Sequence, residues 1–194
     1  MELLVTSRMP SRWGEYAISA FGTPGDRYPH VVLERGVAAA VAAGKPIPLR
    51  VHSECMTGDV FGSRRCDCGE QLHAALAHFK EHGGMLVYLR QEGRGIGLVE
   101  KLKAYNLQEE GMNTFDANVA LGHGEDERSY GDVGNILAHF GVEEVQLLTN
   151  NPAKQTALES LGIRVQERLA VTAASNPDNE AYLKAKREIT GHLL

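Results

Sequence analysis

Short apolar runs alternate with amphipathic segments along most of the chain. Runs typical of β-strands occupy residues 2–6, 16–21, 30–34, 48–52, 85–89 and 144–148. Apolar residues at helical spacing predict a helix over residues 69–82. Two further helices are expected over residues 98–110 and 131–140. A further helix begins at Pro152 and ends before Gly162, since proline is favoured in the first helical turn and glycine just after the last. A strand follows it, and a polar, amphipathic helix with an apolar tail ends the chain.

This order of elements predicts the fold class. Strands prevail before residue 48, and strands and helices alternate after it. Such a pattern is typical of an α/β or α+β fold, so we expect a mixed β-sheet core flanked by helices. The 194 residues contain no repeat, low-complexity tract or clear linker, and we therefore expect a single domain over residues 1–194.

Composition narrows the functional classes. Hydrophobic residues make up 43% and charged residues 23%, the balance of a soluble globular protein. The sequence shows neither a signal-peptide pattern nor an apolar stretch long enough to span a bilayer, so we expect a cytoplasmic protein without a membrane partner. The net charge of −5 argues against nucleic-acid binding, which needs a basic surface.

The cysteines are the first sign of specific chemistry. Cys55, Cys66 and Cys68 follow the pattern C-x10-C-x-C, and the chain has 3 cysteines in all. An odd number of thiols without an export signal favours a metal site over a disulfide framework. Three protein ligands leave one tetrahedral position open, as in a catalytic zinc site that holds a water. Two alternatives stay open: a closed structural zinc site completed by His52 or His73, or three unrelated buried thiols.

Arginines gather near the cysteines although the chain is acidic overall. They are Arg50, Arg64, Arg65, Arg90 and Arg94. Arginine stays charged and binds phosphate through two parallel hydrogen bonds, so this group suits a triphosphate. The glycine-rich loop at residues 91–97 could bring backbone N–H groups against phosphate oxygens, although an ordinary surface turn has the same composition.

Two further segments carry candidate site residues. Residues 124–130 place acidic side chains beside Arg128, which could pair a carboxylate base with a phosphate-binding arginine. The alternative is the charged start of a helix. Residues 149–152 follow a predicted strand and open a helix, a frequent ligand position in α/β folds, and Lys154 could contact a phosphate from there.

Taken together, these motifs resemble GTP cyclohydrolase II. The matching segments are RVHSEC (50–55), RRCDCG (64–69), RQEGRGIGL (90–98), DER (126–128), LLTNNPAK (147–154) and the terminal GHLL. They occur in the family's order, whereas the residues before them are similar only in kind. The resemblance implies a hydrolase of riboflavin biosynthesis. It would convert GTP and water into a 2,5-diamino-6-ribosylamino-pyrimidinone 5′-phosphate, formate and pyrophosphate.

The resemblance also implies cofactors and partners. One Zn²⁺ per chain would be held by Cys55, Cys66 and Cys68, and Mg²⁺ would accompany the triphosphate. The enzyme would form a homodimer.

Residue roles follow from the same resemblance. Asp126 would accept a proton, Arg128 would act as a nucleophile toward the α-phosphate, and Tyr105 would lie near the base and the metal. The residues implied in GTP binding are Arg50, Val51, His52, Ser53, Glu54, Gln71, Glu92, Gly93, Arg94, Thr114, Thr149 and Lys154.

Physical chemistry agrees with most of these roles. The C8 atom of guanine is a poor electrophile, and a zinc-activated water is a reasonable attacker. Glu92 or Gln71 could match the N1–H and amine edge of guanine. An arginine with a pKa above about 12 is a weak nucleophile, so the alternative is that Arg128 stabilises charge on the phosphate in flight.

One segment departs from the family pattern. Where the family usually has Gly-Tyr-Asp-Thr, this chain has Gly111-Met112-Asn113-Thr114, and we count Met112 among the substrate-binding positions. A tyrosine hydroxyl could orient the formyl group during a second hydrolysis, and methionine offers no comparable donor. The alternative product is therefore a formamidopyrimidine nucleotide monophosphate, without formate release. A rival of another class is a non-catalytic GTP-binding regulator with structural zinc.

Overall fold

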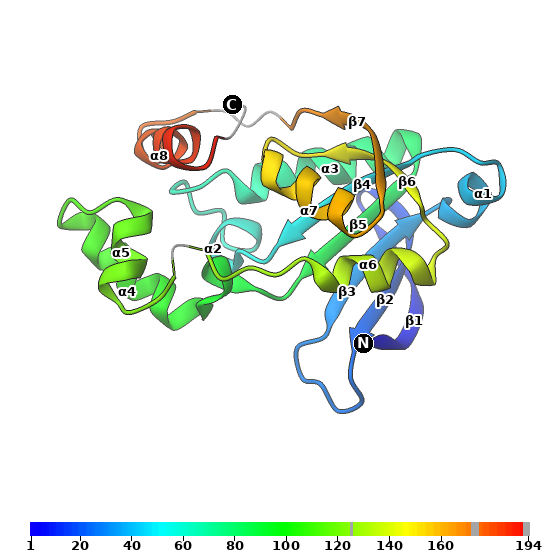
Figure 1. Cartoon of the computed structure of the whole chain (residues 1–194), viewed down its shortest axis with the longest axis horizontal. Helices are drawn as coiled ribbons and strands as arrows, with labels where there is room; N and C mark the ends of the chain where they lie inside the picture. Colours follow the sequence, from blue (N-terminus) through cyan, green and yellow to red (C-terminus); the bar gives the residue numbers. More distant parts are fainter. Residues whose placement is uncertain (125, 172–174, 192–194) are drawn as a thin grey trace. The chain divides into compact units, whose positions relative to one another are not determined.

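A seven-stranded β-sheet has the strand order β1-β2-β3-β5-β4-β6-β7 (Figure 1). The strands are β1 (Glu2–Ser11), β2 (Gly14–Gly22), β3 (His30–Arg35), β4 (Ile47–Ser53), β5 (Gly84–Leu89), β6 (Glu144–Leu148) and β7 (Arg164–Leu169). β1, β2, β3 and β5 pair antiparallel in turn, whereas β4 pairs with β6 and β6 with β7 in parallel. The mixed sheet that the sequence predicts is confirmed.

The computed structural model describes residues 1–124, 126–171 and 175–191. The chain divides into two compact units. Unit 1 consists of Met1–His52, His73–Arg90 and Tyr130–Val171, and unit 2 of Ser53–Leu72, Gln91–Ser129 and Thr172–Leu194. The single domain expected from the sequence stays a prediction.

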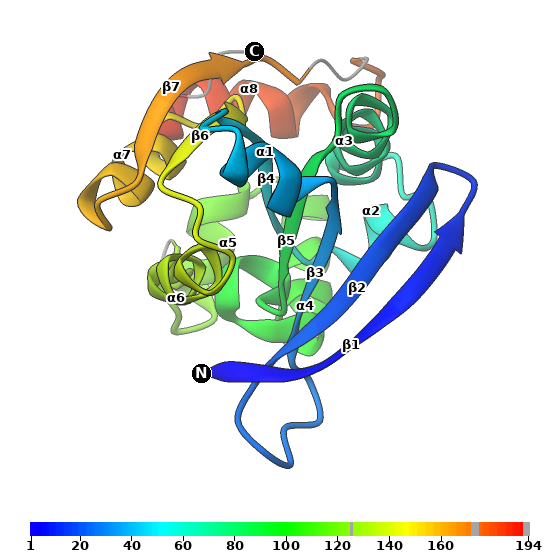
Figure 2. The same ribbon diagram turned by 90° about the vertical axis from the view of Figure 1, so that its right-hand side faces the viewer.

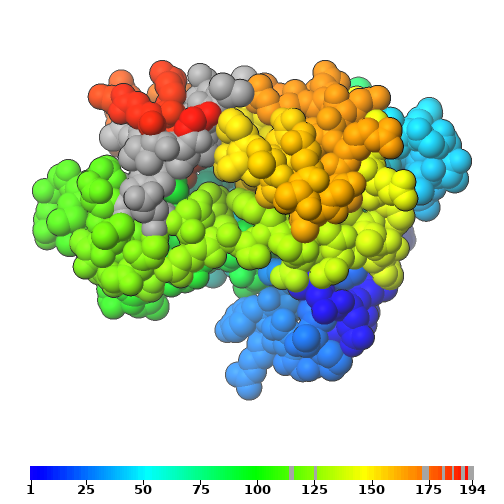
Figure 3. Space-filling model, viewed as in Figure 1, coloured from blue at the N-terminus to red at the C-terminus, as the bar shows by residue number. Residues whose placement is uncertain are grey.

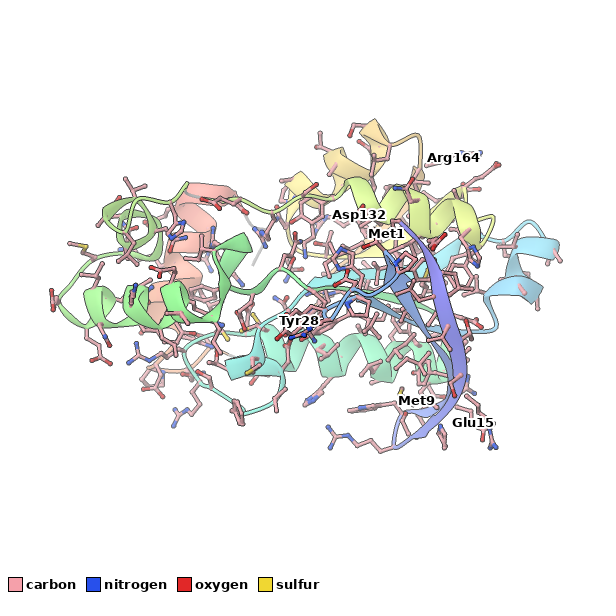
Figure 4. The ribbon with its side chains drawn as sticks, turned by 90° about the horizontal axis from the view of Figure 1, so that it is seen from below. Met1, Met9, Glu15, Tyr28, Asp132 and Arg164 are labelled. Carbon is pink, nitrogen blue, oxygen red and sulfur yellow. The ribbon has the colours of Figure 1, made fainter. Side chains whose placement is uncertain are left out.

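Unit 1 is built in three layers. The sheet is the middle layer, with α6 (Gly131–His139) and α7 (Pro152–Ser160) on one face and the later part of α3 (Cys68–His82) on the other (Figure 4). A short helix, α1 (Val37–Ala42), follows β3. Asn151 caps α7 by accepting a hydrogen bond from the Ala153 N–H, and Pro152 takes the first helical position.

The hydrophobic core lies in unit 1. β4 is buried on both faces, since Leu49 and Val51 alternate with the equally buried Arg50 and His52. The apolar face of β4 packs with α6, from which Ile136 joins the same core cluster. β4 therefore buries an arginine and a histidine on one face of the sheet.

The β1–β2 hairpin is longer than its apolar residues predict. Figure 2 shows it as a long twisted ribbon, and Met9 and Glu15 mark the end where the chain turns (Figure 4). Polar side chains pair across the two strands, as Arg8 does with Glu15 and Thr6 with Ser19. Such polar pairs extend a strand without adding to the hydrophobic pattern.

The surface of unit 1 in Figure 3 shows α7 and β7 beside α6. Gly134 of α6 faces Leu161, which follows α7, and a Cβ at Gly134 would lie 3.6 Å from that side chain.

No helix of the described residues is long and apolar enough to cross a membrane.

The described elements of unit 2 are helical. They are α2 (Met56–Asp59), the 3₁₀-helix η1 (Glu92–Gly95), α4 (Gly97–Glu109), α5 (Thr114–Ala120) and α8 (Glu180–Thr190), together with the start of α3. The sequence predicts α4 and α8, but α2 and α5 are short and have no apolar periodicity to announce them. The apolar tail after α8 lies outside the described residues, as does Glu125.

Candidate metal centre and nucleotide site

Three thiols meet in unit 2 at the start of two helices. Cys55 precedes α2, Cys68 begins α3, and Cys66 lies two residues before it. The three sulfur atoms lie within 4.8 Å of one another, and Cys55 Sγ is 3.7 Å from Cys66 Sγ. All three cysteines are free thiols.

Local backbone structure makes room for this cluster. The Cys55 N–H donates to Asp59 Oδ2 at 3.0 Å, which fixes the first turn of α2. A Cβ at Gly58 would lie 2.8 Å from Cys66 Sγ and 3.3 Å from Cys55 Sγ, so only glycine fits beside the sulfurs. The thiols therefore surround a space that the backbone leaves open.

The sulfur geometry fits one metal ion. Thiolates bound tetrahedrally at about 2.3 Å from zinc lie about 3.8 Å apart, which is close to the 3.7 Å between Cys55 Sγ and Cys66 Sγ. Among the described residues, the side chains placed to hold a metal ion together are these three cysteines. Both histidines considered as a fourth ligand have contacts within unit 1: His52 stacks on Tyr88, and His73 Nε2 lies 3.2 Å from Arg12 Nη2.

The thiols differ in acidity. Hydrogen bonds from Cys66 and Cys68 lower the pKa of Cys55 well below its usual range, against the effect of burial. The hydrogen bond to Cys55 raises the pKa of Cys66 to about 11, and the pKa of Cys68 is raised for the same reason. Of the three thiols, Cys55 is therefore the one whose ionised form the neighbouring groups favour.

Buried charge surrounds Cys55. Lys101 on α4 places Nζ 3.1 Å from Cys55 Sγ and 2.7 Å from Glu92 Oε1. Burial alone would lower the pKa of Lys101, but Cys55 and Glu92 outweigh it and raise the pKa. Tyr105, one turn further along α4, places its hydroxyl 3.3 Å from Thr57 Oγ1 on α2, so that a side-chain contact joins the two helices.

The glycine-rich loop forms η1, where the sequence predicts a loop. Gly93 and Arg94 both adopt left-handed backbone conformations, with φ of 62° and 63°. Arg94 is the one described non-glycine residue with positive φ, a strained conformation frequent at functional sites. Its carbonyl accepts from the Glu127 N–H at 3.0 Å. The loop and the 126–128 segment are therefore packed against each other.

Asp126 and Arg128 form a close ion pair. Arg128 Nε donates to Asp126 Oδ1 at 2.8 Å, and Nη2 donates to Oδ2. Arg94 Nη1 lies 4.0 Å from the same carboxylate. Burial opposes the charge of Asp126, but the hydrogen bonds from Arg128 outweigh it and lower the pKa of the carboxyl group.

In unit 1, candidate residues meet beside the end of β6. Arg50 Nη1 donates to the Leu148 carbonyl at 3.0 Å, and Lys154 Nζ donates to the Val51 carbonyl at 2.8 Å. Thr149 follows β6 and accepts from the Asn151 N–H through Oγ1. Both cations are buried, so this strand end holds positive charge at the position where α/β folds bind ligands.

The other candidate residues have separate surroundings in unit 2. Ser53 Oγ accepts from Gln91 Nε2 at 2.9 Å, and Gln71 Nε2 donates to Asp67 Oδ2 at 2.5 Å. Glu54 is half-buried. Met112 is 41% exposed between α4 and α5. Thr114 begins α5, and its side chain lies outside the described residues.

Comparison with known proteins adds the deciding observation. A sequence model of the family described as GTP cyclohydrolase II matches residues 2–170, most of the chain. The chain belongs to the GTP cyclohydrolase II family. The resemblance inferred from the motifs is thereby confirmed.

Relatives within the family fall into two sizes. The chain is 45% identical over 194 residues to a protein named GTP cyclohydrolase-2 from Acinetobacter baylyi. The matched region covers 100% of this chain and 96% of that protein. A protein of the same name from Acinetobacter baumannii is 47% identical with the same coverage. The riboflavin biosynthesis protein RibBA of Parabacteroides distasonis is 47% identical over 96% of this chain, which spans only 45% of that protein.

The structure adds residues to which the sequence motifs of this GTP cyclohydrolase II family member assign no role. Lys101 and Asp67 belong to the surroundings of the thiols, and Lys186 of α8 places Nζ 2.5 Å from Asp67 Oδ1. One signal was present, because Lys101 precedes Tyr105 by four residues and therefore shares its helix face. Asp67 lies inside the RRCDCG motif, between two of the cysteines, whereas Lys186 carried no signal.

Proposed function

We propose that this chain is a zinc-dependent enzyme that opens the imidazole ring of GTP and releases pyrophosphate and formate for riboflavin synthesis. The three thiols carry the proposal, because their spacing suits a single ion and leaves a fourth position for a water. Family membership supports the choice of substrate. Part of the proposal is that Mg²⁺ accompanies the triphosphate and that the enzyme is a cytoplasmic homodimer.

Zinc held by Cys55, Cys66 and Cys68 would supply Lewis acidity toward the water that attacks C8 of guanine. The other steps belong to side chains. Arg128 and Arg94 provide positive charge for the phosphates, and the Asp126 carboxylate accepts a proton. Arg50 and Lys154 add charge at the strand ends of unit 1.

The guanine-binding role predicted for Glu92 has an alternative in the contacts of its carboxylate. Oε2 accepts from the Met56 N–H at 2.7 Å, and Oε1 accepts from Lys101 and from the Gly93 N–H. These contacts suit a residue that shapes the loop. The backbone of residues 92–94 then remains the part of the loop proposed to contact GTP.

The test is a product balance with the zinc-loaded protein, GTP and Mg²⁺. We expect one pyrophosphate and one formate per GTP from the unaltered chain, and no formate from Cys66→Ser. Full ring opening by protein shown to be metal-free would contradict the zinc role. GTP binding without any product would instead favour the regulator.

Met112 supports a second candidate product, a formamidopyrimidine nucleotide monophosphate. The residue is 41% exposed and offers no hydroxyl where the family usually has tyrosine. If the second hydrolysis needs that hydroxyl, the product mass retains the formyl group, and Met112→Tyr removes it. One equivalent of formate per GTP from the unaltered protein excludes this product.

A further inference from the structure

Lys101 is a buried cation that has no part in the proposed steps. It lies on the second turn of α4 and is 9% exposed. An ammonium group removed from water persists only where charged partners and hydrogen bonds compensate it. Here the partners are the Cys55 sulfur at 3.1 Å and the Glu92 carboxylate at 2.7 Å.

Glu92 fixes the direction in which Lys101 points. One carboxylate oxygen binds Nζ, and the other accepts the N–H of Met56, the residue after Cys55. The same side chain therefore holds the ammonium group and the backbone next to the thiol. This arrangement aims a donor at one sulfur of the cluster.

Tyr105 is the third partner of the Lys101 ammonium group, after Cys55 and Glu92. Lys101 Nζ lies 5.7 Å from the centroid of that ring, within the range of a cation–π interaction. Thr57 links the tyrosine hydroxyl at 3.3 Å to Cys55 Sγ at 3.6 Å. Thiolate, carboxylate and aromatic ring together surround a single charge.

A site of three thiolates has an electrostatic disadvantage. Together they carry more negative charge than a divalent ion cancels, and electron-rich sulfur weakens a metal as a Lewis acid. Groups that hydrogen-bond to metal ligands tune this donation. We propose that Lys101 is a positioning residue of the metal centre: aimed by Glu92, it donates a hydrogen bond to the Cys55 thiolate and withdraws electron density from the metal–sulfur bond. This inference rests on the proposed metal centre.

The test uses the full chain loaded with Co²⁺ in place of zinc. We expect the thiolate-to-cobalt charge-transfer band of Lys101→Met to move to lower energy, because the sulfur lone pair loses its stabilising charge. With zinc, kcat should fall about tenfold while KM for GTP changes little. In Lys101→Arg, both the shift of the band and the fall in kcat should be smaller, because the positive charge is kept. Lys103→Met is the matched control, since Lys103 is exposed on the same helix and pairs with Glu100.

An unchanged band in Lys101→Met with one cobalt per chain would overturn the proposal, since Lys101 would then only hold α4 in place. If Lys101→Met fails to fold or to bind cobalt, Glu92→Gln decides, because it keeps the lysine and loosens its aim. A smaller shift in the same direction supports the proposal, and no shift overturns it. Wild-type protein without any charge-transfer band would instead refute the metal centre itself.

Discussion

Asp126 and Arg128 occupy each other's hydrogen-bonding groups in the described structure. A guanidinium group held by a carboxylate through two donors stays charged and planar, and its nitrogen lone pairs are delocalised. This state suits the binding of phosphate and not nucleophilic attack. A phosphate that competes for the same donors would release the carboxylate, so the two proposed roles of this pair would be coupled.

Replacing Arg128 tests which role it has. We expect Arg128→Ala to slow pyrophosphate release about a thousandfold, the scale of a lost arginine finger. Arg128→Lys should recover little, since lysine lacks the planar fork although it is the better nucleophile. The measurement is pyrophosphate release together with intact mass. A nucleotide adduct trapped on residue 128 would contradict charge stabilisation. Arg164→Ala serves as control, since Arg164 is exposed on β7 and has no assigned role in the site.

The same pair predicts a pH dependence of stability. Because Arg128 lowers the pKa of Asp126 in the folded state, the pair stabilises the protein above the unfolded pKa of about 4, and this contribution fades as pH falls through the folded pKa. Asp126→Asn should therefore lower the free energy of unfolding by about 0.5–1 kcal/mol near pH 7, since solvent screens a partly exposed pair. Urea unfolding at pH 3–8 measures the difference. The two proteins should therefore differ less in their free energy of unfolding as the pH falls. A difference that widens toward pH 3 would contradict the prediction.

At the residue scale, the sequence predicts ligands better than it predicts what surrounds them. Three clustered thiols have few other uses in such a chain, so their pattern alone indicates a metal. Lys101 looks like an ordinary charged residue on a helix, and the motif around Glu92 predicts a contact with GTP and not one with the thiol cluster. Only the folded chain shows that they are buried against Cys55, since burial of charge has no periodic signature.

A buried ion pair attaches helix α8 to the segment between α2 and α3, which contains Cys66. Asp67, between two of the cysteines, is fully buried, with Lys186 Nζ at 2.5 Å from Oδ1 and Gln71 Nε2 at 2.5 Å from Oδ2. Lys186 also lies 4.5 Å from the centroid of the Tyr182 ring on the same helix. Both oxygens of one carboxylate thus hold separate elements of unit 2 together.

Removing Lys186 should leave that carboxylate uncompensated. Breaking one side of a buried pair costs about 3–5 kcal/mol, so Lys186→Met should lower the thermal midpoint of unit 2 and weaken zinc retention. Adding Asp67→Asn should reverse part of the loss, because the unpaired charge is then gone. Lys184→Met, at an exposed position of α8, controls for the helix itself. Equal midpoints for both lysine variants would refute the attachment.

At the element scale, length decides what the sequence predicts. The run at residues 85–89 and the helix ending before Gly83 have enough apolar residues to show their periods, and β5 and α3 follow them. Helices α2 and α5 are one or two turns long. Their positions depend on contacts such as the Thr57–Tyr105 bond, which local sequence does not reveal.

The two units differ in what stabilises them. Unit 1 contains the large buried side chains of the sheet and its helices, such as Phe79 and Leu147. Among the described residues of unit 2, the buried hydrophobic ones are Cys55, Ala104 and Ala117, all small. Its interior is otherwise made of paired polar groups, which contribute little net stability unless every partner is in place. Unit 2 should therefore depend on a bound metal.

Hydrogen exchange with and without metal tests this dependence. After removal of zinc by a chelator, we expect amides of α2 and α4 to exchange much faster. The reason is that the thiols at the starts of α2 and α3 lose the ion that they share. Amides of β4, β5 and β6 should keep their protection, since their core contains no metal ligand. Cys66→Ser should reproduce the pattern without chelator, and restored zinc should reverse it only in the unaltered chain. Faster exchange of equal size in both units would mean that they unfold together, and the stability of unit 1 would then depend on the metal as well.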